Sequence, residues 1–477
     1  MRINHNSLAL NASDHFAKIN SNIAKSMERL SSGYKITSPA DDAAGLAIST
    51  KLSAQIRGLD RASLNSNDGV SVIQSAEGGL GEIHKILARI RELCVQASND
   101  VNSEEDRDSI QEEVNALIEE VTQISDTTSF NGQKLLNGEL SRRTLSSEDN
   151  FKTTYLSESV NTGIYELEIT AVAKQAVYTT GFSYSNDTVT EEQAGTIKVN
   201  GFDVSITEGM SKVEVFEKLQ SHLNKIGIDV FSSNDNGKTE EDFKSGAPVV
   251  YKSKEYGSEE KIEISVTNPE LEAFLGVKDK DLVNGSDCSA RINPTDNGFS
   301  TTASFSTDGN EISVVDRNGF AMTIEVDPNA EITGGVLSTE IEVLSAGVMV
   351  VQTGANSGEQ ISLDIPNVGA KGLGIENLIM YTHEYASKAV EAVDEAIKKV
   401  SNIRSKLGAY ENRLTDIYDN LEVQGESLTA AFSRLMDTDM AEEMTNYTQQ
   451  EVLSQAAISM MQRSNERPES ILQLLQN

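Results

Sequence analysis

The chain has 477 residues, which at about 150 residues per domain allows roughly three domains. It carries 40 Lys and Arg against 74 Asp and Glu, so its formal net charge is 40 − 74 = −34. This charge repels phosphate groups, which excludes a general nucleic-acid binder and a protein that docks on anionic membranes. No run of about 18 apolar residues is present, so we expect no membrane-spanning segment.

The first 30 residues combine an amphipathic pattern with frequent polar residues. Asn, Ser, Lys and Asp interrupt each apolar stretch, so we expect no cleavable secretory signal. Apolar residues recur three or four positions apart, which predicts a helix with one apolar side. Gly33 should end this helix as its C-cap. The apolar residues are Phe16, Ile19, Ile23, Met27 and Leu30.

A second helix is predicted to begin at Ser38. Ser38 suits the N-cap, Pro39 suits the first helical position, and Asp41 and Asp42 suit the positive end of the helix dipole. Apolar residues then keep heptad spacing in several segments, which indicates bundle helices and a buried Cys94. These residues are Leu52, Ile56, Leu59, Val70, Ile73, Ile83, Leu87, Ile90, Cys94, Ile110, Val114, Leu117, Val121 and Ile124.

Residues 141–345 carry strand and turn signals instead of helical spacing. The Asn-Gly pairs at 200–201 and 318–319 each separate two short alternating stretches, so each predicts a β-hairpin. A further hairpin is expected between residues 348–352 and 361–365. We therefore predict a β-rich insertion in the middle of the chain.

One part of the insertion has a more detailed pattern. Ser211 and Glu214 have the spacing of a capping box, which predicts a helix after the first hairpin. We expect a small ββαβ unit at 195–231. The insertion is poor in aromatic residues, and the small aromatic group that a glycan-binding adhesin could use consists of Tyr178, Phe182 and Tyr184.

The longest unbroken heptad pattern lies near the C-terminus, from Ala389 to Leu421. Because both chain ends carry such seams, we expect them to pack as an antiparallel bundle. The predicted fold class is α + β multi-domain: a long antiparallel α-helical coiled-coil bundle formed by both chain ends, with a β-rich central insertion. The seam residues are Val400, Ile403, Leu407, Leu414, Ile417 and Leu421.

No pattern predicts a catalytic residue, a metal site or a cofactor site. The five histidines lie in unrelated segments, and His383-Glu384 lacks the second His of a zinc-protease helix. Phosphate-binding, dinucleotide-binding and nucleophile-elbow motifs are absent from the sequence. Cys94 and Cys288 do not form a disulfide framework. We predict that the chain is not an enzyme and needs no cofactor.

Several segments near both ends, in this order along the chain, resemble those of bacterial flagellins, the subunits of the flagellar filament. The resemblance covers about 1–140 and 346–477 of the sequence. The segments are Met1–Asn6, Arg29–Lys35, Ser38–Ile48, Arg89–Leu93, Phe130–Leu136, Gln352–Asn356, Arg404–Ala409 and Asn465–Leu472.

The resemblance implies a layered layout. Residues 1–36 would pair with 436–477 in the filament core, residues 37–140 and 346–435 would form an outer helical bundle, and 141–345 would project from the filament surface. We expect the terminal stripes to be poorly ordered until neighbouring copies cover them. The core-packing residues would be Phe16, Ile19, Ile23, Leu30, Leu472, Leu474 and Leu475.

The resemblance also implies function and partners. The chain would self-assemble into the extracellular flagellar filament for motility, after export without a cleaved signal peptide. Its partners would be further copies of itself, a flagellar export chaperone, and the hook–filament junction and filament cap proteins, with no nucleic acid and no membrane. Two alternatives stay open: a hook–filament junction protein, which shares the terminal pattern, and an adhesin activity in the insertion.

A possible receptor site lies on the predicted helix around residue 90. Arg89, Leu93 and Gln96 share one helix face, and Ile90 and Cys94 should point inward, which places Arg89 and Leu93 toward the side or outside. Together with Glu113, these residues resemble the flagellin motif that an innate-immune Toll-like receptor binds. The motif departs from the family pattern at Ala88 and Cys94.

Overall fold

The structure is a computed structural model, and the chain folds into two compact units. The structure describes residues 6–157, 159–291, 298–300, 302–317, 319–330, 332, 336–344 and 347–476. The side chains of residues 468 and 471–476 are not part of this description. The first unit comprises Met1–Gly69, Val351–Ile361 and Arg413–Asn477. The second unit comprises Val70–Val350 and Ser362–Asn412.

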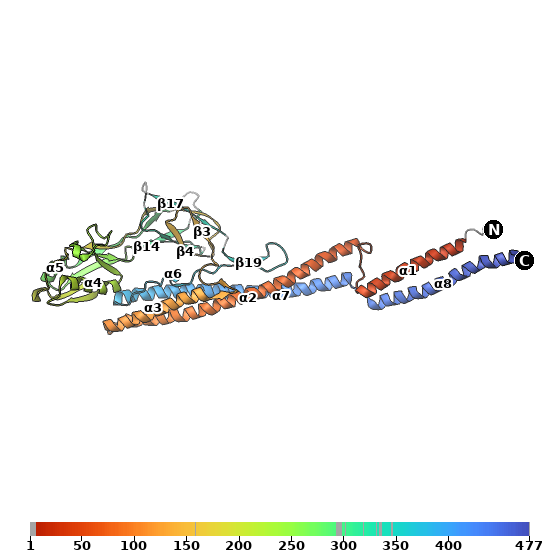
Figure 1. The fold of residues 1–477 in the computed structure, drawn as a ribbon, viewed down its shortest axis with the longest axis horizontal. Helices are drawn as coiled ribbons and strands as arrows, with labels where there is room; N and C mark the ends of the chain where they lie inside the picture. Colours follow the sequence, from red (N-terminus) through yellow and green to blue (C-terminus); the bar gives the residue numbers. More distant parts are fainter. Residues whose placement is uncertain are drawn as a thin grey trace. The chain divides into compact units, whose positions relative to one another are not determined.

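In the first unit, the two terminal helices pack against each other (Figure 1). α1 (Ser7–Ser32) begins after Asn6, whose side-chain oxygen accepts a backbone hydrogen bond from the first turn. The amide nitrogen of Asn6 also donates to the backbone carbonyl of Ser464 in α8 (Met440–Gln476), at 2.9 Å. α1 ends at Gly33, whose backbone is left-handed, as predicted for the C-cap.

The predicted helix start at Ser38 is wrong, because α2 (Ala43–Ala97) begins later. The carboxylate of Asp41 accepts hydrogen bonds from the backbone N–H and hydroxyl groups of Ser38 and Thr37, so the Ser38 hydroxyl does not cap a helix. These hydrogen bonds, those from Ser38 first, lower the pKa of Asp41. Asp42 accepts a backbone hydrogen bond from the first turn of α2 at 2.9 Å and takes the N-cap role.

In the second unit, α2 and α7 (His383–Met436) run antiparallel. The guanidinium of Arg404 pairs with Glu77 at 2.6 Å, and that of Arg91 pairs with Asp394, also at 2.6 Å. Higher residue numbers on α2 therefore meet lower numbers on α7. This arrangement confirms the antiparallel bundle that the two seams predict.

Buried apolar rows fill the bundle of the second unit, to which α3 (Glu104–Thr127) and the short α6 (Ala370–Leu373) also belong. Leu414 and Leu421, in the first unit, are buried too, whereas Ile417 is only partly buried. The buried rows comprise Ile73, Leu80, Ile83, Leu87, Ile90 and Cys94 of α2, Ile110, Val114, Ile118 and Val121 of α3, and Ala389, Val393, Ala396, Val400, Ile403 and Leu407 of α7.

The insertion contains two cores, and the first lies between two four-stranded antiparallel sheets. Their strand orders are β13-β5-β17-β3 and β14-β15-β16-β4. Both sheets contribute buried residues, such as Leu167 and Ile324. The pairing of β15 with β16 confirms the second predicted hairpin, and Asn318 of its turn lies outside the described residues. The strands are β3 (Thr144–Ser146), β4 (Phe151–Leu156), β5 (Gly163–Ala171), β13 (Ser289–Arg291), β14 (Ser304–Asp308), β15 (Glu311–Val315), β16 (Ala321–Val326) and β17 (Leu337–Val343).

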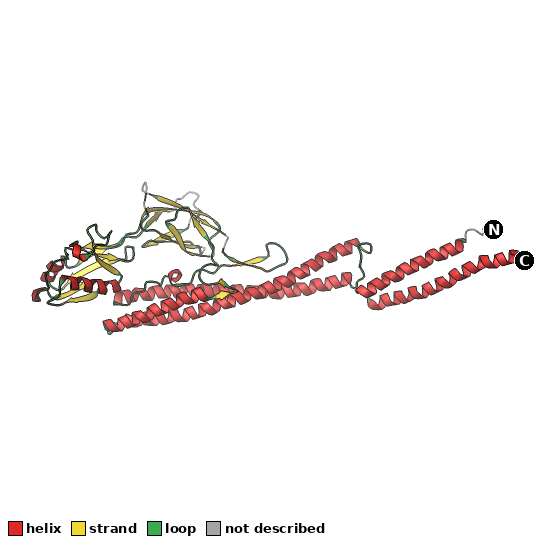
Figure 2. Ribbon diagram, viewed as in Figure 1, coloured by secondary structure: helices red, strands yellow, loops and turns green. Residues whose placement is uncertain are grey.

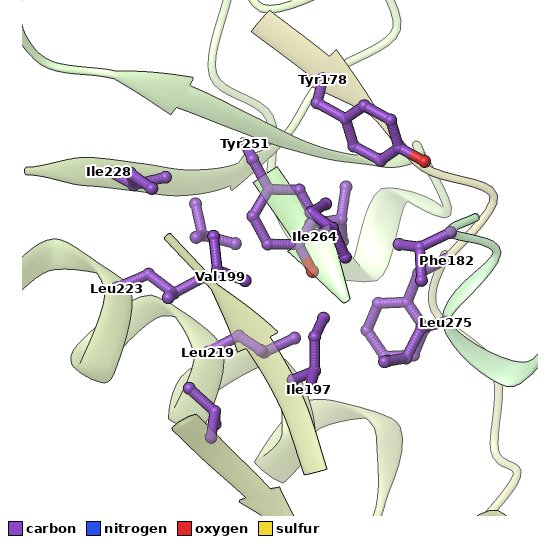
Figure 3. Packing of buried hydrophobic residues seen from close by; sticks show 14 of the residues in the cluster. Tyr178, Phe182, Ile197, Val199, Leu219, Leu223, Ile228, Tyr251, Ile264 and Leu275 are labelled. Atoms are coloured by element: carbon purple, nitrogen blue, oxygen red, sulfur yellow. The ribbon is translucent and has the colours of Figure 1, made fainter. Parts of the chain in front are cut away.

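The second core joins two further sheets and two helices (Figure 3). The strand orders are β12-β11-β7-β8 and β6-β10-β9, and both helices contribute buried leucines. The elements are β6 (Val177–Thr179), β7 (Gly195–Val199), β8 (Phe202–Ile206), α4 (Lys212–Lys225), β9 (Ile228–Ser232), β10 (Val249–Ser253), β11 (Lys261–Val266), α5 (Pro269–Leu275), β12 (Asp281–Asn284) and the 3-10 turns Glu191–Gln193 and Phe243–Ser245.

The predicted ββαβ unit has the expected order of elements, but its last strand belongs to a different sheet. The β7–β8 hairpin turns at Asn200, which has a positive φ of 49°, and Ser211 and Glu214 form the expected capping box. However, β9 pairs with β10 in a separate sheet. The local pattern specifies a strand after the helix but carries no information about its distant partner.

The aromatic group of the insertion does not form an exposed platform. Tyr178 and Phe182 are buried in the second core, where Figure 3 shows them among aliphatic side chains. The ring of Phe182 stacks on that of Phe243, with 5.6 Å between their centroids. These two residues therefore stabilise the insertion and are not available to bind a glycan.

Two small hairpins complete the fold, and Figure 2 distinguishes the strands from the helices by colour. β1 (Ser129–Phe130) pairs with β2 (Gln133–Lys134), and β18 (Met349–Gln352) pairs with β19 (Gln360–Leu363), which confirms the predicted third hairpin. Among the described residues, no helix is both long enough and apolar enough to cross a membrane.

Replacing a seam residue should destabilise the bundle far more than replacing an exposed one. Leu407→Ala removes a buried side chain, so we expect a loss of about 2–5 kcal/mol in the free energy of unfolding. Val95→Ala, at an exposed position of α2, should change it by only about 0.5 kcal/mol. Urea unfolding followed by circular dichroism at 222 nm measures both. Equal losses of unfolding free energy in the two variants would contradict the assignment of Leu407 to the buried seam.

Candidate functional site

The terminal helix pair, defined as α1 and α8, is incompletely buried. Among the described side chains of the pair, only Ser26 and Glu443 are buried. The Glu443 carboxylate lies 3.7 Å from the guanidinium of Arg29. The predicted core residues are only partly buried, namely Phe16, Ile19, Ile23 and Leu30. Leu472, Leu474 and Leu475 fall within α8, but their side chains lie outside the description.

The outer face of the terminal helix pair, by which we mean its exposed apolar residues, is extensive. Met444, Val452 and Leu453 of α8 line a shallow groove of about 560 Å³ together with Thr445, Thr448 and Gln449. Exposed apolar patches of this kind mark interaction surfaces in soluble proteins. The outer face consists of Leu8, Leu10 and Met27 of α1 and Met440, Met444, Val452, Leu453, Ile458 and Met460 of α8.

The apolar stripes predicted near the two ends, Phe16–Leu30 and Val452–Leu475, include Met27 and part of the α8 residues of this outer face. The pattern missed Leu8, Leu10, Met440 and Met444. The missed residues lie before the predicted stripes, near the first turns of α1 and α8. The signal that could have found them is the number of large apolar residues on both sides of α8, which exceeds what one partner helix can cover.

The second candidate site is the Arg89 cluster, which consists of Arg89, Glu92 and Glu113. The guanidinium of Arg89 on α2 donates to the Glu113 carboxylate of α3 at 2.8 Å and 3.1 Å, and to that of Glu92 at 3.2 Å. The hydrogen bond with Glu113, followed by that with Glu92, raises the pKa of Arg89 above its ordinary value. All three side chains are exposed, as is Gln96. Glu92 was not part of the predicted site.

Leu93 contradicts the prediction that it lies toward the side or outside, because it is only 2% exposed. α3 contacts α2 through the Arg89–Glu113 pair, and α7 contacts α2 through the Arg91–Asp394 pair. Two neighbouring helices cover a wider arc of α2 than the single seam assumed in the sequence analysis. Leu93 therefore belongs to the buried side of α2.

No arrangement in the described part of the chain suggests catalysis. None of its His, Cys, Asp and Glu side chains form a group of three or more that could hold a metal ion. Both cysteines are buried and unpaired. Burial raises the pKa of Cys94 to about 12 and that of Cys288 to about 11, so both remain thiols at neutral pH. Neither thiol is suited to act as a nucleophile.

Comparison with known proteins identifies the family. The family model for the bacterial flagellin N-terminal helical region matches residues 3–141, and the model for the bacterial flagellin C-terminal helical region matches residues 390–475. A flagellin of Clostridium tyrobutyricum is 32% identical over 468 residues, which are 98% of this chain and 100% of that protein. The chain belongs to the bacterial flagellin family.

Other flagellins agree with this assignment. A flagellin of Bacillus subtilis strain 168 is 30% identical over 477 residues, which span all of both chains. A solved structure of flagellar hook associated protein-3 from Legionella pneumophila is 15% identical and covers 81% of this chain and 98% of its own, with a TM-score of 0.31. Family membership confirms the resemblance seen in the sequence and makes the chain a structural protein of the flagellar filament.

The two thiols of this flagellin should not react with thiol reagents in the native state. At pH 8, pKa values of about 12 and 11 leave less than about one thiolate in a thousand at either position. We expect no reaction with Ellman's reagent in buffer and two reactive thiols in 8 M urea. Reactivity should rise only as the pH approaches 11. Cys94→Ser should leave one thiol in urea, and rapid native reaction at pH 8 would refute the burial of these groups.

Proposed function

We propose that the chain polymerises into the extracellular flagellar filament that drives motility. The observation that carries this proposal is the outer face of the terminal helix pair, which is open to water in the isolated chain. A neighbouring copy that covered it would gain about 25 cal/mol for each Å² of apolar area removed from water. Repeated contacts between unlike surfaces of successive copies build an open helical polymer instead of a closed ring.

The net charge of −34 fits this role. Like charges keep separate copies soluble before assembly, because they repel one another over about 10 Å at 0.1 M salt. Added salt screens this repulsion, so polymerisation should become more favourable as ionic strength rises. The charge thus opposes premature assembly without altering the apolar contact itself.

For the filament, we propose the layout that the resemblance implies. Residues 1–36 and 436–477 form the core, 37–140 and 346–435 form the outer bundle, and 141–345 project outward. Further proposed partners are a flagellar export chaperone, the hook–filament junction proteins and the filament cap proteins. Export would occur without removal of a signal peptide.

A charge on the outer face should block polymerisation. Val452 lines the shallow groove and is exposed in the single chain, so Val452→Asp should leave the monomer folded. In the polymer it would bury an unpaired carboxylate, which costs several kcal/mol. We expect the minimum concentration for polymerisation to rise at least tenfold, measured by sedimentation and negative-stain electron microscopy.

Val452→Leu is the matched control and should polymerise like the unaltered chain. If Val452→Asp formed filaments at the same concentration as the unaltered chain, the outer face would not be part of the contact between copies. If the unaltered chain instead binds to isolated hooks and never elongates, the junction-protein alternative would replace the proposed function.

We also propose that the Arg89 cluster, with Gln96, contacts the host Toll-like receptor for flagellin. An exposed guanidinium held in place by two carboxylates is a planar donor of the kind that is enriched at interface hot spots. The side chain of Leu93 is buried and makes no contact with the receptor in this proposal.

Removal of the cluster should weaken receptor binding. We expect Arg89→Ala and Glu113→Ala each to raise the dissociation constant at least tenfold, because each loses a fixed charge at the centre of the surface. Surface plasmon resonance with the receptor ectodomain measures this. Lys198→Ala breaks an exposed 3.3 Å ion pair with Asp203 in the insertion and should leave binding unchanged. Equal affinity of the Arg89 variant and the unaltered chain would contradict the proposed site.

A further inference from the structure

The methionines of the chain differ sharply in exposure. Three are buried: Met322 and Met380 are 0% exposed, and Met436 is 6% exposed. Of those whose side chains are described, four are exposed by about half, and all four belong to the terminal helix pair. The exposed fractions are 56% for Met27, 48% for Met440, 49% for Met444 and 63% for Met460.

The exposed methionines belong to the outer face of the terminal helix pair. Met444 lines the shallow groove beside Val452 and Leu453. Met440 precedes it by one helical turn on α8, Met460 lies further along the same helix, and Met27 is on α1. A methyl thioether is apolar and flexible, so these side chains suit a surface that changes from water to a packed contact.

We propose that Met27, Met440, Met444 and Met460 form an oxidation-sensitive modification site, and that their conversion to methionine sulfoxide by hypochlorous acid prevents self-assembly. This inference rests on the proposed function, because it assigns the outer face to the contact between copies. It adds a chemical control of that contact.

The chemistry requires only the side chain and the oxidant. The thioether sulfur attacks hypochlorous acid, a sulfur–oxygen bond forms as the chlorine–oxygen bond breaks, and chloride and one proton leave. Sulfur loses two electrons, and chlorine gains them. Reaction depends on access to the sulfur, so the four exposed thioethers react before Met322 and Met380, which are fully buried.

Oxidation changes what the surface can bury. A sulfoxide oxygen is a strong hydrogen-bond acceptor, and removing it from water without a donor is unfavourable. Around Met444 the groove is lined by apolar Val452 and Leu453 and by Gln449, Thr445 and Thr448. The two threonine hydroxyls already donate to backbone carbonyls of α8. In contrast, the single chain keeps its fold, since none of the four side chains is part of a buried core. Oxidation should therefore act on assembly and leave folding unchanged.

The first experiment treats purified monomer with a few equivalents of hypochlorous acid and then removes the oxidant. Peptide mass spectrometry should find a gain of one oxygen at the four exposed methionines and none at Met322 and Met380. Circular dichroism should stay unchanged, and the minimum concentration for polymerisation should rise at least tenfold. A methionine sulfoxide reductase should restore it. The untreated sample must polymerise, and its failure would count against the proposed function and not against the oxidation site.

Two variants isolate the four side chains. Replacing all four by Leu keeps the face apolar and of similar volume, so this variant should polymerise both before and after treatment. Met322→Leu with Met380→Leu is the control and should lose polymerisation after treatment, as the unaltered chain does. The proposal is overturned if the fully oxidised chain polymerises at the untreated concentration, if the reductase does not restore assembly, or if the four-Leu variant loses assembly equally.

Discussion

The packing of α2 against α7 is the contact on which the rest of the second unit depends. Glu77 and Arg404 meet at 2.6 Å although 327 positions separate them in sequence. The seam can therefore form only if the residues between α2 and α7 bring α7 back alongside α2. Loop closure becomes only slowly more costly as the loop lengthens, so a large folded insertion is compatible with this requirement. The bundle fixes where the insertion starts and ends, and it leaves the content of the insertion open.

The parts of the fold that depend on local pattern could be predicted from the sequence. Heptad spacing found the long helices, Asn200-Gly201 found the β7–β8 hairpin, and Gly33 marked the end of α1. The predictions that failed concern groups that have more than one available hydrogen-bond partner. Ser38 has the side chain of an N-cap, but Asp41 takes its hydroxyl, and β9 is a strand whose partner β10 is chosen by distant contacts.

The candidate sites were predictable to a similar extent. The residue types of the Arg89 cluster were found, but not the burial of Leu93, because one heptad seam cannot show that α3 and α7 both cover α2. Part of the outer face, Leu8, Leu10, Met440 and Met444, was missed since these residues lie before the apolar stripes predicted near the two ends. The terminal helix pair contains a charged contact between its two helices. The Arg29–Glu443 ion pair, at 3.7 Å, joins a buried carboxylate to a partly exposed guanidinium and adds little net stability after desolvation. The described apolar side chains of this helix pair are partly buried or exposed, so apolar surface remains for other contacts.

The insertion is joined to the bundle by polar contacts and by two tyrosines that pack against its second core. The lysines of Lys388–Glu259, Lys261–Glu384 and Lys225–Asp108 lie 2.9, 3.1 and 2.8 Å from their carboxylates, and Asn200 donates to the Tyr385 hydroxyl at 3.0 Å. Such partly exposed pairs orient surfaces but contribute little stability. Every buried member of the two insertion cores lies within residues 141–345, and Tyr381 and Tyr385, from the start of the C-terminal helical part, pack against the second core. The buried residues of the insertion thus come from the insertion itself, and the two tyrosines attach it to the bundle. Changes on the insertion surface alter what the chain presents to its surroundings, while the seam and the terminal helix pair keep the contacts that assembly requires.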